Sequence, residues 1–246
     1  MEPYDAIAES YDREHAGFED DIEFYRSLIQ EGPVLEIGVG SGRVAAALIE
    51  EGFEVWGIDP STEMLDRARR RVDSSSARRL IQQRVEELAL EQRFAVVLFS
   101  LNALWHVTQP DAQRRALERA RSHCESGALL VVDSSNPLTM ADRHADGLVR
   151  QRFVSRTPTE TVLGHSAVWD DLAEQTLDMT LWYDVSPHGG QVQRHITQLR
   201  LRYLFRHELE LLLQLTGFTR RQTYGSYDLD PYSSDSPNLL VVAEAT

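Results

Sequence analysis

The chain has 246 residues, of which 42% are hydrophobic, and its formal net charge at pH 7 is −14. The length and apolar content suffice for one folded domain with a buried core, whereas the negative charge repels phosphate backbones and argues against nucleic-acid binding. The single cysteine, Cys124, excludes an internal disulfide and a cysteine-based zinc site, and the absence of lysine among the 25 basic residues excludes Schiff-base and P-loop chemistry.

No apolar run in the sequence approaches membrane-spanning length. The first ten residues, MEPYDAIAES, are acidic and do not resemble a secretory signal. We therefore expect a soluble, cytoplasmic protein that does not bind a membrane.

The first 30 residues predict a helical segment. Apolar residues recur at roughly helical spacing among acidic ones between positions 4 and 30, and Gly17 divides the segment in two. We expect residues 1–30 to form a helical cap on the domain that follows.

Strands and helices alternate from Pro33 onward. Apolar runs predict buried strands for PVLEIGV, FEVWGID, RRLIQQRV, RFAVVLFS and GALLVVDS. Helices are predicted for SGRVAAALIEEG, for PSTEMLDRARRRV with Ser61 or Thr62 as its N-cap, and for QPDAQRRALERARSHC. This alternation implies right-handed crossovers and a parallel sheet that is covered by helices on both faces.

The alternation stops after Pro137. Residues 138–147 predict a short helix or loop, and four runs with period-two patterning within 148–205 predict a small antiparallel sheet inserted into the domain. We expect this insert to be a substrate lid or an oligomer contact, through which a homodimer would form. The helix RHELELLLQLTG and the strands FTRRQTYGSY and PNLLVVAEA complete a single domain over residues 1–246.

The turn after the first strand carries three glycines, Gly38, Gly40 and Gly42, in the sequence VLEIGVGSGRV. Open α/β folds bind ligands at this edge of the sheet, where glycines let a ligand approach the backbone and the helix N-terminus offers free N–H groups. Glu36 lies inside the strand, and a buried carboxylate needs a partner, either a cationic ligand amine or a nearby loop.

Two further residues indicate which ligand this turn holds. Asp59 ends the second strand, where an acid accepts hydrogen bonds from a ribose diol and disfavours a 2′-phosphate. Arg43 stands where a dinucleotide fingerprint has a small residue, and its side chain would crowd a pyrophosphate. The pattern favours a ligand with a ribose and a small charged tail over a dinucleotide.

The motifs VLEIGVGSGR, VWGIDPSTEMLDRARRR, RFAVVLFSLNALWHV and LRYLFRHELELLLQLTGF follow one another in this order. With them the chain resembles, from about Tyr4 to its C-terminus, the class I S-adenosylmethionine-dependent methyltransferases, most closely the small-molecule N-methyltransferases of amino-sugar and glycine type. The resemblance implies a Rossmann-like, seven-stranded, mostly parallel sheet of order 3-2-1-4-5-7-6 with strand 7 antiparallel. It also implies in-line transfer of a methyl group to a nitrogen or oxygen of a small molecule, with S-adenosylhomocysteine as the second product.

The resemblance also assigns cofactor-binding residues. Glu36 would lie near the methionine amine and Asp59 would bind the ribose hydroxyls. The remaining positions would line the methionine, ribose or adenine portions of the cofactor, namely Gly38, Gly40, Gly42, Met64, Leu101 and Asn102. Met64 fits a place in the core of its helix equally well.

The adenine end departs from the family pattern. Many relatives have Gly-Asp at the end of the third strand, and the aspartate holds the adenine amino group. This chain has Gln83 and Arg84 there. Adenine would then be held by the backbone of Val85 or Glu86, or by the Glu86 carboxylate.

The transfer needs a correctly placed acceptor and neither a covalent residue nor a metal. His106 follows the fourth strand and is a candidate base, although a capping or surface histidine is an equal alternative. Tyr11 matches a tyrosine that folds over the cofactor in related enzymes, or packs the N-terminal helix onto the domain.

Residues of the insert are the other candidates for contact with the acceptor. Trp169, Trp182 and Tyr183 occupy strands of the insert, so some would face the pocket and others solvent or a partner chain. Arg200 and Arg202 share a strand face, which is either an acidic-substrate site or solvated surface.

Two other functions stay open. One is an NAD-dependent oxidoreductase on the same architecture, which Arg43 and the absence of a Tyr-x-x-x-Lys pair disfavour. The other is a non-catalytic S-adenosylmethionine-binding protein.

Overall fold

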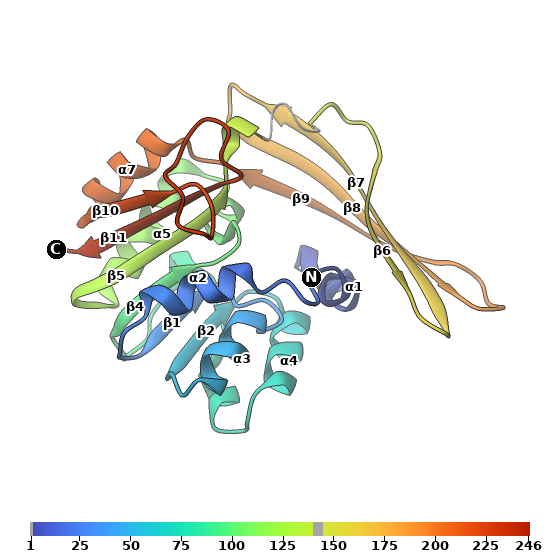
Figure 1. The fold of residues 1–246 in the computed structure, drawn as a ribbon, viewed down its shortest axis with the longest axis horizontal. Coiled ribbons are helices and arrows are strands. Elements are labelled where there is room, and N and C mark those ends of the chain that lie inside the picture. The colour runs from blue at the N-terminus through green and yellow to red at the C-terminus, as the bar shows by residue number, and fades with distance from the viewer. Residues whose placement is uncertain (1, 140–144) are drawn as a thin grey trace.

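The computed structural model describes residues 2–139 and 145–246, which form a layered α/β body and a projecting sheet (Figure 1). The α/β body is built on a seven-stranded sheet of order β10-β11-β5-β4-β1-β2-β3. Its strands are β1 (Val34–Ile37), β2 (Val55–Asp59), β3 (Leu80–Gln82), β4 (Phe94–Phe99), β5 (Cys124–Ser135), β10 (Phe218–Tyr224) and β11 (Asn238–Ala245). All neighbours pair in parallel except β11, which is antiparallel to both β5 and β10. The predicted fold class and strand order are confirmed.

Helices cover both faces of this sheet, as the strand patterning predicts (Figure 1). One face packs against α2 (Asp20–Leu28), α3 (Arg43–Glu50) and α4 (Thr62–Arg71), and the other against α5 (Pro110–Ser122) and α7 (Arg206–Leu215). Leu35 and Ile37 of β1 join the α5 and α7 side, whereas Val34 joins the α2 and α3 side. Because successive strand residues alternate between faces, Glu36 lies on the same side as Val34.

Short 3₁₀ turns connect several of these elements. They are η2 (Ser76–Arg79), η3 (Val85–Glu87) and η4 (Ala103–His106). Helix α4 begins as predicted, because the Ser61 hydroxyl caps it by accepting a hydrogen bond from the Met64 N–H at 3.1 Å. Among the described residues, no helix is long and apolar enough to cross a membrane.

The N-terminal segment is helical and interrupted, as predicted. It comprises η1 (Pro3–Ala6), α1 (Ala8–Glu14) and then α2. Gly17, in the interruption, has a φ of +82°, a conformation that glycine adopts without strain.

The second sheet is antiparallel, as predicted for the insert. Its order is β6 (Arg150–Arg156), β7 (Glu160–Asp171), β8 (Thr176–Pro187) and β9 (Gln193–Arg202). Its buried face packs Val162, Leu181, Tyr183 and Leu199 against Ile7, so the sheet rests on the N-terminal segment. The helix or loop predicted for 138–147 falls partly outside the described residues.

Candidate active site

A cavity of about 880 Å³ lies at the carboxyl ends of β1, β2, β3 and β4, within the volume range of small-molecule sites. The turn after β1 forms its floor, and residues of η1, α1 and β9 complete its walls. The cavity is therefore at the sheet edge that the glycine-rich turn predicts.

The three glycines of that turn serve different purposes. All three have positive φ, at +76° for Gly38, +53° for Gly40 and +81° for Gly42. A Cβ at Gly42 would lie 2.7 Å from the Ala68 Cβ of α4, and one at Gly38 would lie 2.8 Å from the Ala103 Cβ. Gly38 and Gly42 thus permit close packing, whereas the backbone beside Gly40 is open to the cavity.

Asp59 is held rigidly at the end of β2. One carboxylate oxygen accepts from the Gly40 N–H at 3.0 Å and the other from the Ser61 N–H at 2.8 Å. Burial raises the pKa of Asp59 to about 6, against the opposing effect of these two bonds. At neutral pH it is ionised, and each oxygen retains a lone pair for a further donor.

Glu36 is buried, and only one of its two carboxylate oxygens has a hydrogen-bond partner. Its Oε1 accepts a hydrogen bond from the Ser100 hydroxyl at 2.9 Å, while its Oε2 has no hydrogen-bond partner within the described ranges. Burial raises the pKa of Glu36 to about 8, so the free carboxyl is mostly protonated at neutral pH. An ammonium group in the cavity would satisfy the second oxygen and favour the ionised form.

Of the predicted cofactor-binding residues Met64, Leu101 and Asn102, two line the cavity and one does not. Met64, 2% exposed, and Leu101, which has a strained φ of +42°, both line the cavity. Asn102 is not among the lining residues, because its side chain accepts from the Ser135 N–H at 2.7 Å. Of these three predicted residues, only Met64 and Leu101 are therefore among those that line the cavity.

The end of β3 supplies the far wall. Gln83, Arg84, Val85 and Glu86 all line the cavity. The Arg84 guanidinium is paired with the Glu2 carboxylate at 2.5 Å. The two residues that depart from the family pattern, Gln83 and Arg84, therefore line the cavity.

His106 stands at the opposite end, in a row of aromatic rings. Its Nε2 is 3.3 Å from the Tyr4 hydroxyl, which belongs to a residue 102 positions away. The Tyr4 ring meets the Tyr11 ring edge-on at 5.5 Å between centroids, and Tyr11 stacks on His15 at 4.0 Å. Tyr4 was not among the predicted site residues, although it lies seven positions, about two helical turns, before Tyr11.

The surrounding protein sets the protonation of His106, Tyr4 and Tyr11. It disfavours the imidazolium of His106, whose side chain is exposed in the cavity, and so lowers the pKa of His106 below its usual value, whereas burial raises the pKa of Tyr11 to about 12. It also raises the pKa of Tyr4. At neutral pH His106 is therefore a neutral imidazole, and Tyr4 and Tyr11 are protonated phenols.

Arg43 has a tertiary role that the sequence does not reveal. Its guanidinium donates to both oxygens of Asp21, at 2.8 and 2.5 Å, and to the Phe18 carbonyl at 2.6 Å. Asp21 is fully buried. Arg43 therefore ties the start of α3 to the N-terminal segment.

None of the three insert aromatics named above lines the cavity. Trp169 is 50% exposed, Trp182 stacks on His165 at 5.4 Å, and the Tyr183 hydroxyl donates to Glu14. Leu199 and Arg200 of β9 line it instead.

The two insert arginines have protein partners. Arg202 is buried and pairs with Glu208 at 2.8 Å, and Arg200 pairs with Asp178 at 2.9 Å on the exposed face. Both guanidinium groups are therefore paired with carboxylates, and of the two residues only Arg200 is among those that line the cavity.

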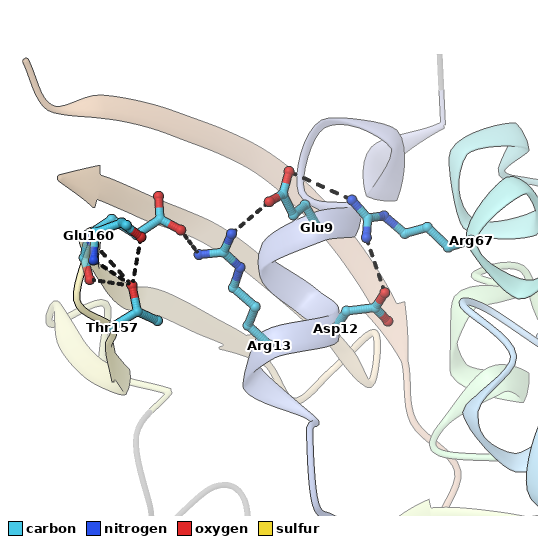
Figure 2. Close-up of polar contacts among 7 residues, drawn as sticks. Glu9, Asp12, Arg13, Arg67, Thr157 and Glu160 are labelled. Atoms are coloured by element: carbon cyan, nitrogen blue, oxygen red, sulfur yellow. Dashed lines mark hydrogen bonds and ion pairs between the residues drawn. The ribbon is translucent and has the colours of Figure 1, made fainter. Parts of the chain in front are cut away.

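Helix α1 joins the insert to the α/β body through charged contacts, which Figure 2 shows in part. Arg13 pairs with Glu160 of β7 at 2.5 Å and with Glu9 at 2.7 Å. On the other side, Asp12 pairs with Arg67 of α4 at 3.2 Å. The wall that carries Tyr11 is therefore held from two directions.

Comparisons with known proteins agree with this geometry. Residues 34–127 match the family described as a methyltransferase domain. Cypemycin N-terminal methyltransferase of a Streptomyces species is 23% identical over 220 residues, which are 86% of this chain and 82% of the relative.

Solved structures match over nearly the whole chain. CcbJ methyltransferase from Streptomyces caelestis has a TM-score of 0.76 at 27% identity, over 93% of this chain and 94% of that one. S-adenosylmethionine-bound CalS10, an amino pentose methyltransferase from Micromonospora echinaspora involved in calicheamicin biosynthesis, has a TM-score of 0.69 at 21% identity, over 99% and 94%.

The segment that matches the family contains the glycine turn, Asp59 and His106, and the structural matches extend over the insert as well. No comparison supports an NAD-dependent oxidoreductase or a non-catalytic protein. The chain is an S-adenosylmethionine-dependent methyltransferase with the class I fold.

Proposed function

We propose that the chain methylates an amine nitrogen of a small molecule that enters the cavity between His106 and the insert sheet. The observation that carries the proposal is that one cavity combines Glu36, which has one unpartnered carboxylate oxygen, and the ionised Asp59 with the uncharged side chains of His106, Tyr4 and Tyr11 at its other end. The names of the relatives, an N-terminal methyltransferase and an amino pentose methyltransferase, support an amine acceptor.

The residues present fit S-adenosylmethionine. Glu36 Oε2 would accept from its ammonium group and Asp59 from its ribose hydroxyls, with Gly38 and Gly40 beneath, whereas the predicted Gly42 packs against α4 and does not line the cavity. Met64, Val85, Glu86 and Leu101 would form the surrounding wall. When bound, the cofactor supplies an electrophilic methyl group on a sulfonium centre.

The aromatic row would orient the acceptor. A neutral His106 can accept a hydrogen bond from an acceptor N–H and so direct the nitrogen lone pair toward the methyl group. Because its pKa is lowered below the usual value, it would not retain a proton at neutral pH, so we assign it an orienting role rather than that of a strong base. Tyr4 would hold the imidazole and Tyr11 would shield the reacting atoms from water.

We propose that the N-terminal segment 1–30 acts as a cap and that the sheet within 148–205 acts as a lid within one domain. The exposed face of that sheet carries Trp169 and Ile196, which are 50% and 54% exposed. A homodimer through this face stays a prediction, as does the cytoplasmic location.

The test has two stages. Calorimetry with S-adenosylmethionine, S-adenosylhomocysteine and NAD first establishes the cofactor. The purified chain is then incubated with S-adenosylmethionine and a panel comprising an amino sugar, its hydroxyl counterpart and a peptide with a free N-terminus, and mass spectrometry detects the added methyl group. Methylation of an amine is expected, whereas methylation of the hydroxyl compound alone, or cofactor binding without turnover, would refute the proposal.

A variant tests the orienting role. His106→Ala should lower kcat while leaving the Kd for S-adenosylhomocysteine unchanged, because the imidazole lies at the acceptor end of the cavity. A loss of cofactor affinity with an unchanged kcat would make His106 a structural residue.

A further inference from the structure

Gln83 has an unusual hydrogen-bonding state for a side chain in the cavity wall. Its Nε2 donates to the Glu87 carbonyl at 3.1 Å, whereas its Oε1 is buried without a hydrogen-bond partner in the part of the chain that the structure describes. A carbonyl oxygen only accepts, so the bond to Glu87 fixes which end of the amide is the oxygen. A buried acceptor without a donor is unfavourable unless a ligand supplies one.

The position of Gln83 indicates which ligand group that is. Its backbone N–H donates to the Asp59 carbonyl at 3.2 Å, and Gln82 lies opposite Asp59 in the pairing of β2 with β3. A nucleoside whose ribose binds Asp59 would therefore place its base along the end of β3, with Met64 of α4 also in the wall. Adenine carries an amino group with two N–H donors, and Gln83 offers the acceptor.

Arg84 cannot perform this role. A guanidinium carries donors only, and this one is engaged by Glu2. We infer that the Gln83 Oε1 accepts a hydrogen bond from the adenine 6-amino group and makes the site selective for adenine over a 6-oxo purine. This inference rests on the proposed function, since it concerns the same cofactor.

A 6-oxo purine would place its own carbonyl against the Gln83 oxygen. Two acceptor oxygens would then face each other, and the fixed amide cannot rotate to offer its N–H without losing the bond to Glu87. The structure thus predicts a difference between two ligands that are otherwise alike, which a merely structural glutamine would not produce.

The experiment measures the Kd of S-adenosylhomocysteine and of its 6-oxo counterpart, S-inosylhomocysteine, by calorimetry. The wild type should prefer the 6-amino ligand by at least about fivefold, the effect of one unsatisfied buried hydrogen bond. Gln83→Met keeps the side-chain length and should abolish the preference, so that the ratio of the two Kd values is about 1. Gln83→Glu keeps an acceptor oxygen in either protonation state and should retain it.

Two control variants make the result specific. Gln82→Met changes the neighbouring glutamine, whose side chain donates to the Pro60 carbonyl at 3.0 Å outside the cavity wall, and should leave the preference unchanged. Glu86→Met should also leave it unchanged. Circular dichroism establishes that each variant is folded.

Each other outcome overturns the inference about Gln83, and one of them also overturns the proposed function. A preference that survives Gln83→Met, that disappears in Glu86→Met, or that is absent from the wild type overturns the inference while the methyltransferase proposal stands. An equal loss of affinity for both ligands in Gln83→Met would show a structural role and also overturn it. Failure of the wild type to bind either ligand would overturn both the inference and the proposed function.

Discussion

Affinity for S-adenosylhomocysteine should rise with pH between 6 and 7, because Glu36 must ionise before it pairs with the ligand ammonium. Burial raises the pKa of Glu36 to about 8 in the free protein. Each pH unit below that value adds about 1.4 kcal/mol to the cost of ionisation. Ionising Glu36 therefore costs about 2.7 kcal/mol at pH 6 and about 1.4 kcal/mol at pH 7, so the Kd should fall about tenfold across this interval.

Calorimetry in buffers of different ionisation enthalpy measures both the Kd and the protons released. The wild type should release about one proton per site at pH 6 to 7, where the ligand amine itself stays protonated. Glu36→Gln is the matched control and should release far less, with only the weak pH dependence that Asp59, whose pKa is about 6, contributes. An affinity that does not change with pH in the wild type, or the same slope in both proteins, would refute the reasoning.

Four further outcomes are expected. Asp59→Ala should weaken cofactor binding by about 1–3 kcal/mol through the loss of charge-assisted hydrogen bonds, and an unchanged Kd in a folded variant would contradict the ribose role. Arg43→Ala should lower the free energy of unfolding by about 3–5 kcal/mol, because Asp21 would be left buried and unpaired; urea denaturation measures this, and a loss under 1 kcal/mol would contradict it. Arg13→Ala should cost less than about 1 kcal/mol in the same assay, since its ion pairs are partly exposed. Because folding raises the pKa of Glu36 above its unfolded value, the unliganded wild type should lose stability relative to Glu36→Gln as pH rises from 5 to 8, and parallel melting temperatures over this range would exclude that linkage.

The fold was largely predictable because its signals are local. Alternating apolar runs and helix caps identified the strands and helices, including the cap at Ser61, and the ordered motifs indicated the sheet topology. The predicted topology in turn located the site at the carboxyl ends of the parallel strands. Charge type and strand position sufficed to select Glu36 and Asp59 as cavity residues.

The remaining features depend on contacts between distant parts of the chain. Period-two patterning cannot tell which face of an insert strand meets the cavity, and so Leu199 was missed in favour of Trp182. Arg43 was interpreted only as an obstacle to a dinucleotide, because its partner Asp21 belongs to a separate helix. The unpartnered oxygen of Gln83 depends on a side-chain conformation, which no sequence pattern reports.

The attachment of the insert to helix α1 has a consequence for engineering. The sheet is contiguous in sequence, yet its supports come from the opposite end of the chain, since Glu160 and Arg152 pair with Arg13 and Glu14 and the sheet packs on Ile7. A chimera that exchanges only the insert between two such enzymes would mismatch these charges and expose apolar surface. Transplanting a new acceptor preference therefore requires that both segments be grafted as one unit.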